Sequence, residues 1–399
     1  MKNIIFTFIL FSLLLYGCES EKWKEININK TVNDTVSSIW DSNGGIPAAL
    51  SDWEVFADIS DSWFSCDYGY ILEYSKMSID QQNNVWLYGP DHWNSPSGIM
   101  AGSLECEENG PKVIVYNSST GEVEKIELDI VPESHLASAS GWTHLENGKI
   151  LLSSVHLFAS LWDEGGVGNE FYDLAFFEDG KFYPISEEVG GYLPVLDYKV
   201  YKNLMYTVFY GINLENKIRI FNIETGQLHN SFIPEQCKHP KWIEVNGENI
   251  FVICQEENNY KLNIYGNDFV LTHSLQVEDT TEQEFRQVFP LAFDTKGNLW
   301  IGYSYIATMK GDQWEIEELY EENDFTYQFI DRTFQRTIIK MMPYKDGMFY
   351  NLDGAFYFGN YEEKEWRKII HNSWALPVEK GKDGKLYVFT GKYILVGEP

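Results

Sequence analysis

The chain has 399 residues, of which 60 are acidic and 30 are basic, so that its net charge at pH 7 is −30. This charge repels phosphate backbones, and we therefore expect no binding to nucleic acid. Hydrophobic residues make up 44% of the chain and aromatic residues 16%, which excludes intrinsic disorder and allows a large core.

Residues 1–17 have the features of a signal peptide. Lys2 precedes an apolar run of 12 residues from Ile4 to Leu15, too short for a membrane-spanning helix, which needs about 20 residues. The run ends in Leu15-Tyr16-Gly17-Cys18, which resembles the lipobox of bacterial lipoproteins. That resemblance implies cleavage before Cys18, a lipid on Cys18 and attachment of the mature chain to a membrane. The alternative is an ordinary secretory peptide that happens to precede a cysteine.

Two acidic residues, Glu19 and Glu21, follow the cysteine. They resemble the surface-export signals of lipoproteins in some Gram-negative groups. We therefore expect a cell-envelope location, with the protein anchored by lipid in the outer membrane and exposed on the surface. The acidic balance argues against electrostatic docking on anionic lipid, so the lipid itself is expected to hold the chain.

The β-propeller predicted below is a ring of blades, which one strand has to close. Glu21 to Ile26 resembles the later segment Lys364 to Ile369, and we expect this N-terminal strand to complete the last blade. A rival closing strand is Asp52 to Phe56, in which case residues 19–50 are mostly tether. Either choice places the tether and the closing strand within residues 18–60.

A short pattern recurs seven times along the chain: a polar turn with Gly or Asn, then an aromatic or aliphatic run. A period near 50 residues, with strand chemistry in each unit, is typical of a β-propeller. We predict an all-β fold, a single propeller in residues 18–399 with seven blades of four antiparallel strands; an alternative with eight blades uses Asp41–Ile46 as the turn of a truncated extra blade. The runs begin at Val85, Ile150, Leu204, Ile250, Leu299, Phe349 and Leu386, with spacings of 65, 54, 46, 49, 50 and 37 residues.

The clearest unit covers residues 288–320. Asp294 to Asn298 is predicted as a hairpin turn, because Asp hydrogen-bonds its own following backbone and Gly tolerates a positive φ. Around this turn the pattern predicts four strands, at Phe289–Phe293, Leu299–Gly302, Tyr305–Met309 and Gln313–Glu317.

This unit also resembles a known family of repeats. Asp294-x-x-Gly297-Asn298-Leu299-Trp300-Ile301-Gly302 is similar to the D-x-x-G-N-[LIV]-W-[IV]-G core of the two-component-regulator propeller repeats, and Asp80 to Gly89 is a looser match. Those repeats build extracellular sensor domains and many exported lipoproteins, so the resemblance implies a propeller and no catalytic residues. Core positions between blades are expected for Trp86, Trp300, Tyr206, Phe251, Tyr350 and Tyr387.

Two long loops are the candidate ligand site, because propellers bind ligands at the central mouth or along one loop-bearing face. Both loops combine Trp, acids and Gly, which suits recognition of a sugar by an aromatic face and hydrogen-bond acceptors. The alternative is that the two tryptophans anchor the loops to the blades. The candidate residues are Asp91, His92 and Trp93 in the first loop and Trp162, Asp163 and Glu164 in the second.

Four cysteines remain after Cys18, and an exported chain permits disulfides. Cys66 and Cys106 fall within one repeat, and so do Cys237 and Cys254, so that these two pairs are the expected disulfides. Buried free thiols are the alternative.

The leading functional expectation is a monomeric, non-enzymatic binding module for a glycan, a peptide or an envelope protein. No catalytic residue, cofactor or metal ligand is assigned, because the sequence has no nucleophile elbow, no phosphate-binding loop and no metal-binding histidine spacing. The alternatives are a scaffold in an envelope complex and a propeller glycoside hydrolase or polysaccharide lyase.

Overall fold

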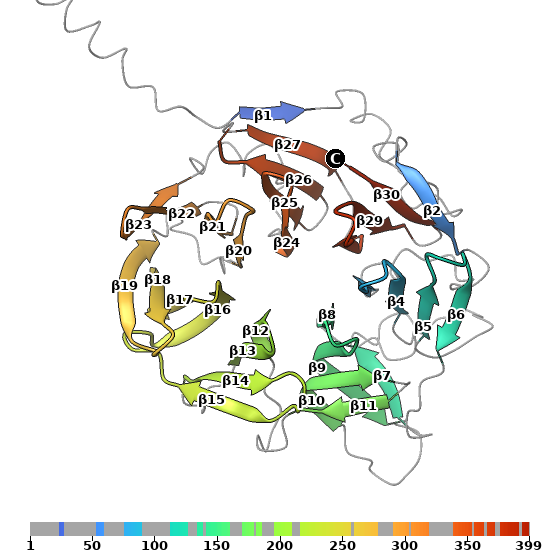
Figure 1. The fold of residues 1–399 in the computed structure, drawn as a ribbon, viewed down its shortest axis with the longest axis horizontal. Coiled ribbons are helices and arrows are strands. Elements are labelled where there is room, and N and C mark those ends of the chain that lie inside the picture. Colours follow the sequence, from blue (N-terminus) through green and yellow to red (C-terminus); the bar gives the residue numbers. More distant parts are fainter. Residues whose placement is uncertain are drawn as a thin grey trace, which may run out of the picture.

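The chain folds as a seven-bladed β-propeller, as the repeat predicts. A computed structural model describes residues 24–27, 53–59, 76–89, 112–126, 134–138, 141–159, 170–178, 181–185, 195–209, 216–256, 259–277, 290–302, 305–318, 338–352, 355–362, 365–371, 376–390 and 393–398. Seven sheets surround an axis, with the first strand of each sheet nearest to it, and their strands are antiparallel except for one added strand in blade six (Figure 1). The described residues contain no helix that could span a bilayer.

The first four blades follow one another along the chain. In blade two, the first strand is divided into two pieces that both pair with the second strand. The strands are β3 (Lys76–Ile79), β4 (Val85–Gly89), β5 (Lys112–Tyr116) and β6 (Val123–Ile126) in blade one; β7 (Ser134–Ser138), β8 (Gly141–His144), β9 (Ile150–Ala159), β10 (Glu170–Glu178) and β11 (Lys181–Pro184) in blade two; β12 (Val195–Tyr201), β13 (Leu204–Phe209), β14 (Ile218–Asn222) and β15 (Leu228–Phe232) in blade three; and β16 (His239–Val245), β17 (Asn249–Glu256), β18 (Asn259–Gly266) and β19 (Leu271–Val277) in blade four.

The last three blades include both N-terminal strands. Blade six has five strands, and blade seven combines the C-terminal strands with one from near the N-terminus. The strands are β20 (Leu291–Phe293), β21 (Leu299–Ile301), β22 (Tyr305–Lys310) and β23 (Gln313–Glu318) in blade five; β24 (Ile338–Tyr344), β25 (Gly347–Leu352), β26 (Ala355–Asn360), β27 (Glu365–His371) and β1 (Lys24–Asn27) in blade six; and β28 (Val378–Lys380), β29 (Leu386–Phe389), β30 (Tyr393–Gly397) and β2 (Glu54–Asp58) in blade seven.

The seven repeated runs are the second strands of the seven blades, and they supply much of the core. These strands carry the large aromatic side chains expected between blades, and Phe251, Trp300 and Tyr350 are completely buried. Each such side chain stabilises the fold by about 1.5–3 kcal/mol relative to an exposed one. One continuous cluster joins blades six, seven and one, with Phe349 and Val85 among its members, so the closing interface is packed like the others.

Ring closure uses the rival strand and corrects our first expectation. The outer strand of blade seven is β2, which pairs antiparallel with β30. Trp53 and Ala57 of this segment are buried, and a Cβ at Gly397 would clash with the Trp53 indole. On the other side, the Tyr116 hydroxyl of blade one donates to the carbonyl of Phe56 (3.1 Å). The segment 53–59 therefore has the apolar residues that an interface between two blades requires.

The segment expected to close the ring lies elsewhere. Strand β1, which contains Lys24 to Ile26, pairs parallel with β27 at the outer edge of blade six. Its sequence, Lys-Glu-Ile-Asn, has a single apolar residue and cannot fill a position between two blades. The resemblance between this segment and residues 364–369 thus reflects two strands that lie side by side (Figure 1).

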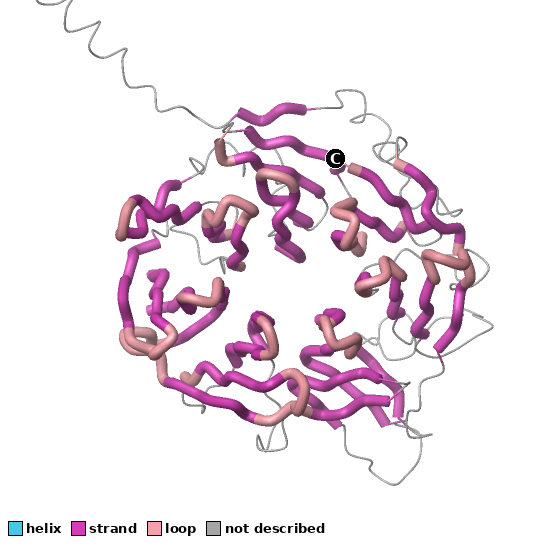
Figure 2. Tube along the Cα trace, in the orientation of Figure 1, coloured by secondary structure: helices cyan, strands magenta, loops and turns pink. Residues whose placement is uncertain are grey.

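Strand direction divides the connections between two faces of the ring. Because neighbouring strands in a blade are antiparallel, the turns from first to second and from third to fourth strand lie on one face, here named the turn face. The connections from second to third strand and from blade to blade leave from the opposite face, here named the loop face. Figure 2 shows that short turns join the strands around the whole ring.

Candidate binding face and axis

The candidate loops begin and end on the loop face of neighbouring blades. The six predicted ligand-binding residues lie in segments 90–111 and 160–169, outside the described residues, and so do Cys18, Cys66 and Cys106. The strand ends around these segments are described: Gly89 and Lys112 in blade one, and Ala159 and Glu170 in blade two. All four are ends of second or third strands, and β3 of blade one lies against β8 of blade two. The topology therefore brings the two loop entrances to one sector of one face.

Charged residues also occur on the first strands, around the axis. Lys199 lies opposite Tyr206 in blade three, and Lys340 lies opposite Asn351 in blade six. Lys199 pairs with Glu244 of blade four, and Lys340 pairs with Glu379 of blade seven. The same device thus joins two pairs of neighbouring blades.

The ion pair between blades three and four is partly exposed to solvent. Lys199 Nζ lies 2.5 Å from Glu244 Oε2, and the two side chains are 37% and 5% exposed. Burial disfavours the charged form of Lys199, but the Glu244 carboxylate outweighs it and raises the pKa of this lysine. Burial raises the pKa of Glu244, against the opposing effect of the Lys199 ammonium. The Glu244 carboxylate therefore keeps the Lys199 ammonium charged.

Asp197 is a second acid at this interface. Its Oδ2 accepts the Ile243 backbone N–H (2.9 Å), and its Oδ1 accepts the N–H of Tyr198 (2.9 Å). Burial raises the pKa of Asp197 to about 7, although both hydrogen bonds and Lys199 favour the ionised form. Glu244 Oε1 accepts the N–H of Val245 (2.9 Å). Because each of these carboxylate oxygens already has a donor, the acids tie blade three to blade four and do not resemble a free catalytic pair.

Polar contacts also link blade six to blade seven. In addition to the pair of Lys340 with Glu379, the Lys380 ammonium donates to the carbonyl of Pro343 (3.0 Å). Asn351 donates through Nδ2 to the carbonyl of Leu376 (3.0 Å). These contacts cross the interface next to the ring closure and hold the first strands at a fixed distance from the axis.

The interface between blades one and two contains a buried imidazole. The His144 ring lies 5.0 Å from the Trp86 ring, and its buried Nε2 has no hydrogen-bond partner among the described residues. Burial lowers the pKa of His144 to about 4, although the Asp80 carboxylate acts in the opposite direction. Ser78, which lies opposite Trp86 in the sheet, also has a buried hydroxyl, and the described part of the chain offers it no hydrogen-bond partner. The imidazole is therefore neutral at pH 7.

The repeat residues have structural roles. Asp294 Oδ1 accepts the N–H groups of Lys296 and Asn298 (both 2.9 Å), and Oδ2 accepts from Asn298 Nδ2 (2.8 Å) and Trp300 Nε1 (3.0 Å). Gly297 has a φ of 87°, as the turn requires. Asp80 makes the corresponding four contacts in blade one, including one to Trp86 Nε1 (3.2 Å). The two repeats thus use the Asp carboxylate in the same way, to close the turn and to accept the indole N–H.

A disulfide fixes the connection from blade three to blade four. Cys237, in that connection, is bonded to Cys254 of β17, which is the pairing expected for this repeat. The Asn263 amide donates to the carbonyl of Gln236 (3.0 Å), and the Tyr265 hydroxyl donates to that of Glu235 (2.7 Å). This blade-to-blade segment is therefore held rigidly on the loop face.

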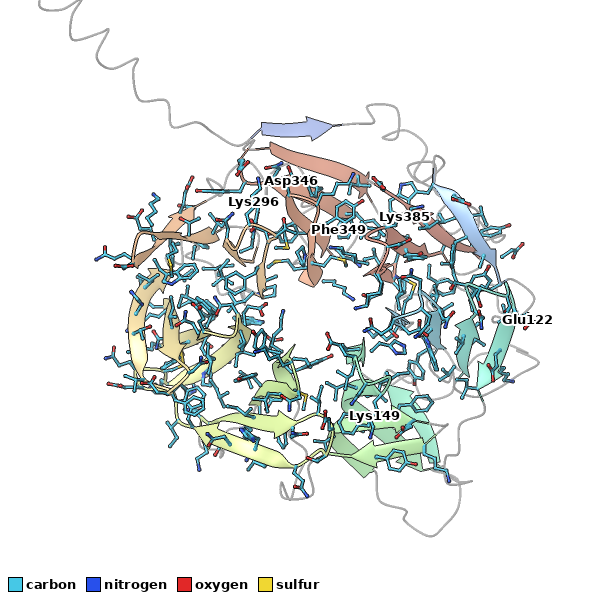
Figure 3. The ribbon with its side chains drawn as sticks, in the orientation of Figure 1. Glu122, Lys149, Lys296, Asp346, Phe349 and Lys385 are labelled. Atoms are coloured by element: carbon cyan, nitrogen blue, oxygen red, sulfur yellow. A yellow bond between two sulfur atoms is a disulfide. The ribbon has the colours of Figure 1, made fainter. Side chains whose placement is uncertain are left out.

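The turn face has a different charge pattern. Lysines occupy the inner turns of several blades, and acids occupy the outer turns. Lys149 pairs with Glu178 (3.6 Å), and Lys296 pairs with Glu362 (2.6 Å). In Figure 3, Glu122 lies at the outer rim, whereas Lys296 and Lys385 come from turns nearer the axis. These turns are short, so this face offers a control for the loop face.

The sequence did not point to the ion pairs around the axis. Lys199 and Lys340 each interrupt a largely apolar strand, which is the one signal that could have found them. Their partners, Glu244 and Glu379, come from the next repeat and cannot be chosen among 60 acids without the ring geometry. Among the described residues, no group of three His, Cys, Asp or Glu side chains is placed to hold a metal ion.

Solved structures resemble this chain at low sequence identity. No family model and no curated protein matches it. Similar solved structures include the extracellular domains of the hybrid two-component systems BT3049 and BT4673 from B. thetaiotaomicron, with 11% and 9% identity and TM-scores of 0.43 and 0.48. Another is the WD40 domain of coronin from Toxoplasma gondii, with 11% identity and a TM-score of 0.44.

The extent of these matches is limited. The alignments cover 81%, 84% and 80% of this chain in the same order, and 51%, 40% and 79% of the other chains. The chain thus spans about half of the first two-component structure and two fifths of the second. At such low identity the similarity concerns the fold.

Proposed function

We propose that this chain is a lipid-anchored binding module of the bacterial cell envelope, and that it binds a glycan on the loop face of blades one and two. The carrying observation is that the segments with Trp93 and Trp162 both start and end on that face, in neighbouring blades. Tryptophan offers a flat apolar surface to a sugar ring, and the acids beside it accept hydrogen bonds from hydroxyl groups.

The scaffold suits binding because rigid blades hold the loop ends. The strands on both sides of the two segments belong to packed sheets, and Val85, Leu151 and Val113 in those sheets are completely buried. Binding residues on loops that a rigid scaffold positions are the common arrangement in proteins. The acids at the axis have structural partners, which favours binding over hydrolysis as the activity of this chain.

The proposed location follows from the N-terminal sequence. The lipobox-like residues Leu15 to Cys18 support cleavage by the lipoprotein pathway, with lipid attached at Cys18. Glu19 and Glu21 support export to the outer membrane and its surface. A glycan-binding module at that location meets its ligand outside the cell.

The test is a glycan and polysaccharide array, probed with the soluble chain from Glu19 to Pro399. Trp93→Ala and Trp162→Ala are expected to lose most of the binding, because the aromatic surface provides much of the contact energy. Lys202→Ala, in an exposed turn of the opposite face, is the matched control and is expected to bind normally.

Each outcome of the array distinguishes the alternatives. Loss in either tryptophan variant, with unchanged circular dichroism, supports the proposed face. Formation of product in the same wells assigns the chain to the enzymes. A chain that binds no glycan contradicts the proposal, and cross-linking in cells then tests a protein partner and the scaffold role.

A further inference from the structure

Blade six has an unusual outer edge. Strand β1 pairs with β27 as a fifth strand, and the pairing is parallel, whereas every other pair among the described strands is antiparallel. The described part of the chain shows this addition in no other blade. Figure 1 shows β1 outside β27, at the rim of the ring. The chain therefore attaches its own N-terminal segment to one particular edge.

The residue types along this edge differ from those of the rest of the chain. The register places Lys24 opposite Glu365 and Glu25 opposite Trp366, with Arg367 and Lys368 opposite the remaining two residues of β1. Opposite charges in directly paired positions favour the pairing. The sequences of β1 and β27 together contain three Lys or Arg residues and two Glu residues, a net charge of 3 − 2 = +1. The whole chain carries −30.

Strand β1 also sets the length of the tether. Lys24 is six residues after Cys18, which is about 20 Å of extended chain. The next described strand, β2, starts at Glu54, which is 36 residues after Cys18, or about 120 Å of extended chain. Pairing of β1 with β27 therefore shortens, about sixfold, the greatest distance that the chain can span between Cys18 and the ring.

We propose that the outer edge of blade six, formed by β1 and β27, faces the membrane in which Cys18 is anchored, so that the ring stands on its edge. The inference rests on the lipidation proposed above. Trp and Arg or Lys are the residues that suit the headgroup region, because the indole is amphipathic and the cations attract lipid phosphates. Both residue types occur in the sequence of the two paired strands, with Lys24 in β1 and Trp366, Arg367 and Lys368 in β27.

This orientation has a consequence for binding. An edge-on ring directs its axis along the membrane plane, so neither the loop face nor the turn face is covered by lipid. The loops of blades one and two then remain open to a glycan. A long free tether allows any orientation, including one in which the loop face lies on the membrane.

The first part of the test measures the strand pairing itself, in the soluble chain from Glu19. Backbone amide exchange at residues 366–368 is compared between the unchanged chain and Glu25→Pro/Ile26→Pro, since proline cannot donate to the ladder. We expect exchange about tenfold faster in the double variant. The control is Thr31→Pro, outside β1, for which we expect unchanged exchange. Equally fast exchange in the unchanged chain would overturn the proposal.

The second part measures orientation in the lipidated full chain, attached to vesicles of phosphatidylethanolamine and phosphatidylglycerol. A fluorophore replaces Glu362 in blade six or Thr225 in blade three, and energy transfer to acceptors in the headgroups is recorded. We expect severalfold higher transfer from blade six, and nearly equal transfer from the two sites in Glu25→Pro/Ile26→Pro. Equal transfer in the unchanged chain would overturn the proposal. If amide exchange is slow but the full chain does not attach to the vesicles, the lipid anchor is absent and the proposed orientation is overturned for that reason. Glycan binding on the array is measured separately and does not depend on this result.

Discussion

The Asp294 carboxylate accepts the indole N–H of Trp300 at 3.0 Å, six residues along the chain, while it also closes the intervening turn. Asp80 holds Trp86 in the same way in blade one. One side chain therefore links the turn of the repeat to its buried aromatic residue. This link explains why the two residue types occur together in the repeat.

The first prediction follows from that link. Asp294→Ala removes the acceptor of the buried Trp300 indole N–H and of two backbone N–H groups in a partly exposed turn, and we expect a loss of about 1–3 kcal/mol in the free energy of unfolding. Urea unfolding followed by circular dichroism measures it. Asp312→Ala, in an exposed turn of the same blade, is the control and should change stability by less than about 0.5 kcal/mol. Equal effects of the two substitutions would show that the hydrogen bonds of Asp294 add nothing to the stability of the fold.

The second prediction concerns the ion pair at the axis. Lys199→Met leaves the Glu244 carboxylate buried without its partner, and we expect a loss of about 1–2 kcal/mol, less than for a fully buried pair because Lys199 is 37% exposed. Addition of Glu244→Leu should recover part of that loss, since no unpaired charge remains. Denaturant unfolding of the two single variants and the double variant gives the coupling free energy between Lys199 and Glu244.

An exposed pair in the same chain provides the comparison. Lys310 and Glu315 are 2.7 Å apart, and their side chains are 64% and 56% exposed. Lys310→Met should therefore cost less than about 0.5 kcal/mol. If it costs as much as Lys199→Met, the position beside the axis has no special importance.

The sequence predicts some parts of this fold well because they depend on local pattern. The turn at Asp294 to Asn298 and the strands around it depend on a few adjacent residues, and the structure has them where expected. The position of β1 depends instead on which sheet edge is free, and a four-residue strand contains too little pattern to specify its partner. The ion pair of Lys199 with Glu244 likewise joins two repeats, and only the ring brings them together. The loops with Trp93 and Trp162 stay predictions.

The third prediction is a pH dependence from Asp197. Its folded pKa of about 7 lies above the ordinary value of 3.8, so the folded state binds more protons between these values. The stability that this group contributes is present below pH 4 and is lost as the pH rises through 7. Relative to the unchanged chain, Asp197→Asn should therefore gain on the order of 2 kcal/mol between pH 4.5 and pH 8. This gain adds to a pH-independent cost, because the Asn amide oxygen can accept only one of the two backbone N–H groups. Urea unfolding at both pH values tests this, and a gain that is equal at both would contradict it.

The fourth prediction has the opposite sign. The pKa of His144 is lowered to about 4, so its contribution to stability is present above pH 6.5 and is lost as the pH falls through 4. His144→Phe keeps a ring beside Trp86 and removes the buried Nε2, for which the residues that the structure describes supply no hydrogen bond. We expect a gain of about 1 kcal/mol at pH 7 and a larger gain at pH 4.5, again from urea unfolding. A destabilised variant at pH 4.5 would indicate that the imidazole has a bound partner.

The fifth prediction separates the two expected disulfides. Cys237→Ala/Cys254→Val removes a bond that closes a loop of 17 residues, and we expect a loss of about 3 kcal/mol in the free energy of unfolding. Reduction of the unchanged chain with dithiothreitol should lower its stability by at least this amount. The double variant then tests the other pair. A further loss on reduction of that variant indicates a bond between Cys66 and Cys106, whereas an unchanged stability contradicts the second disulfide, because no other pair of cysteines remains after Cys18.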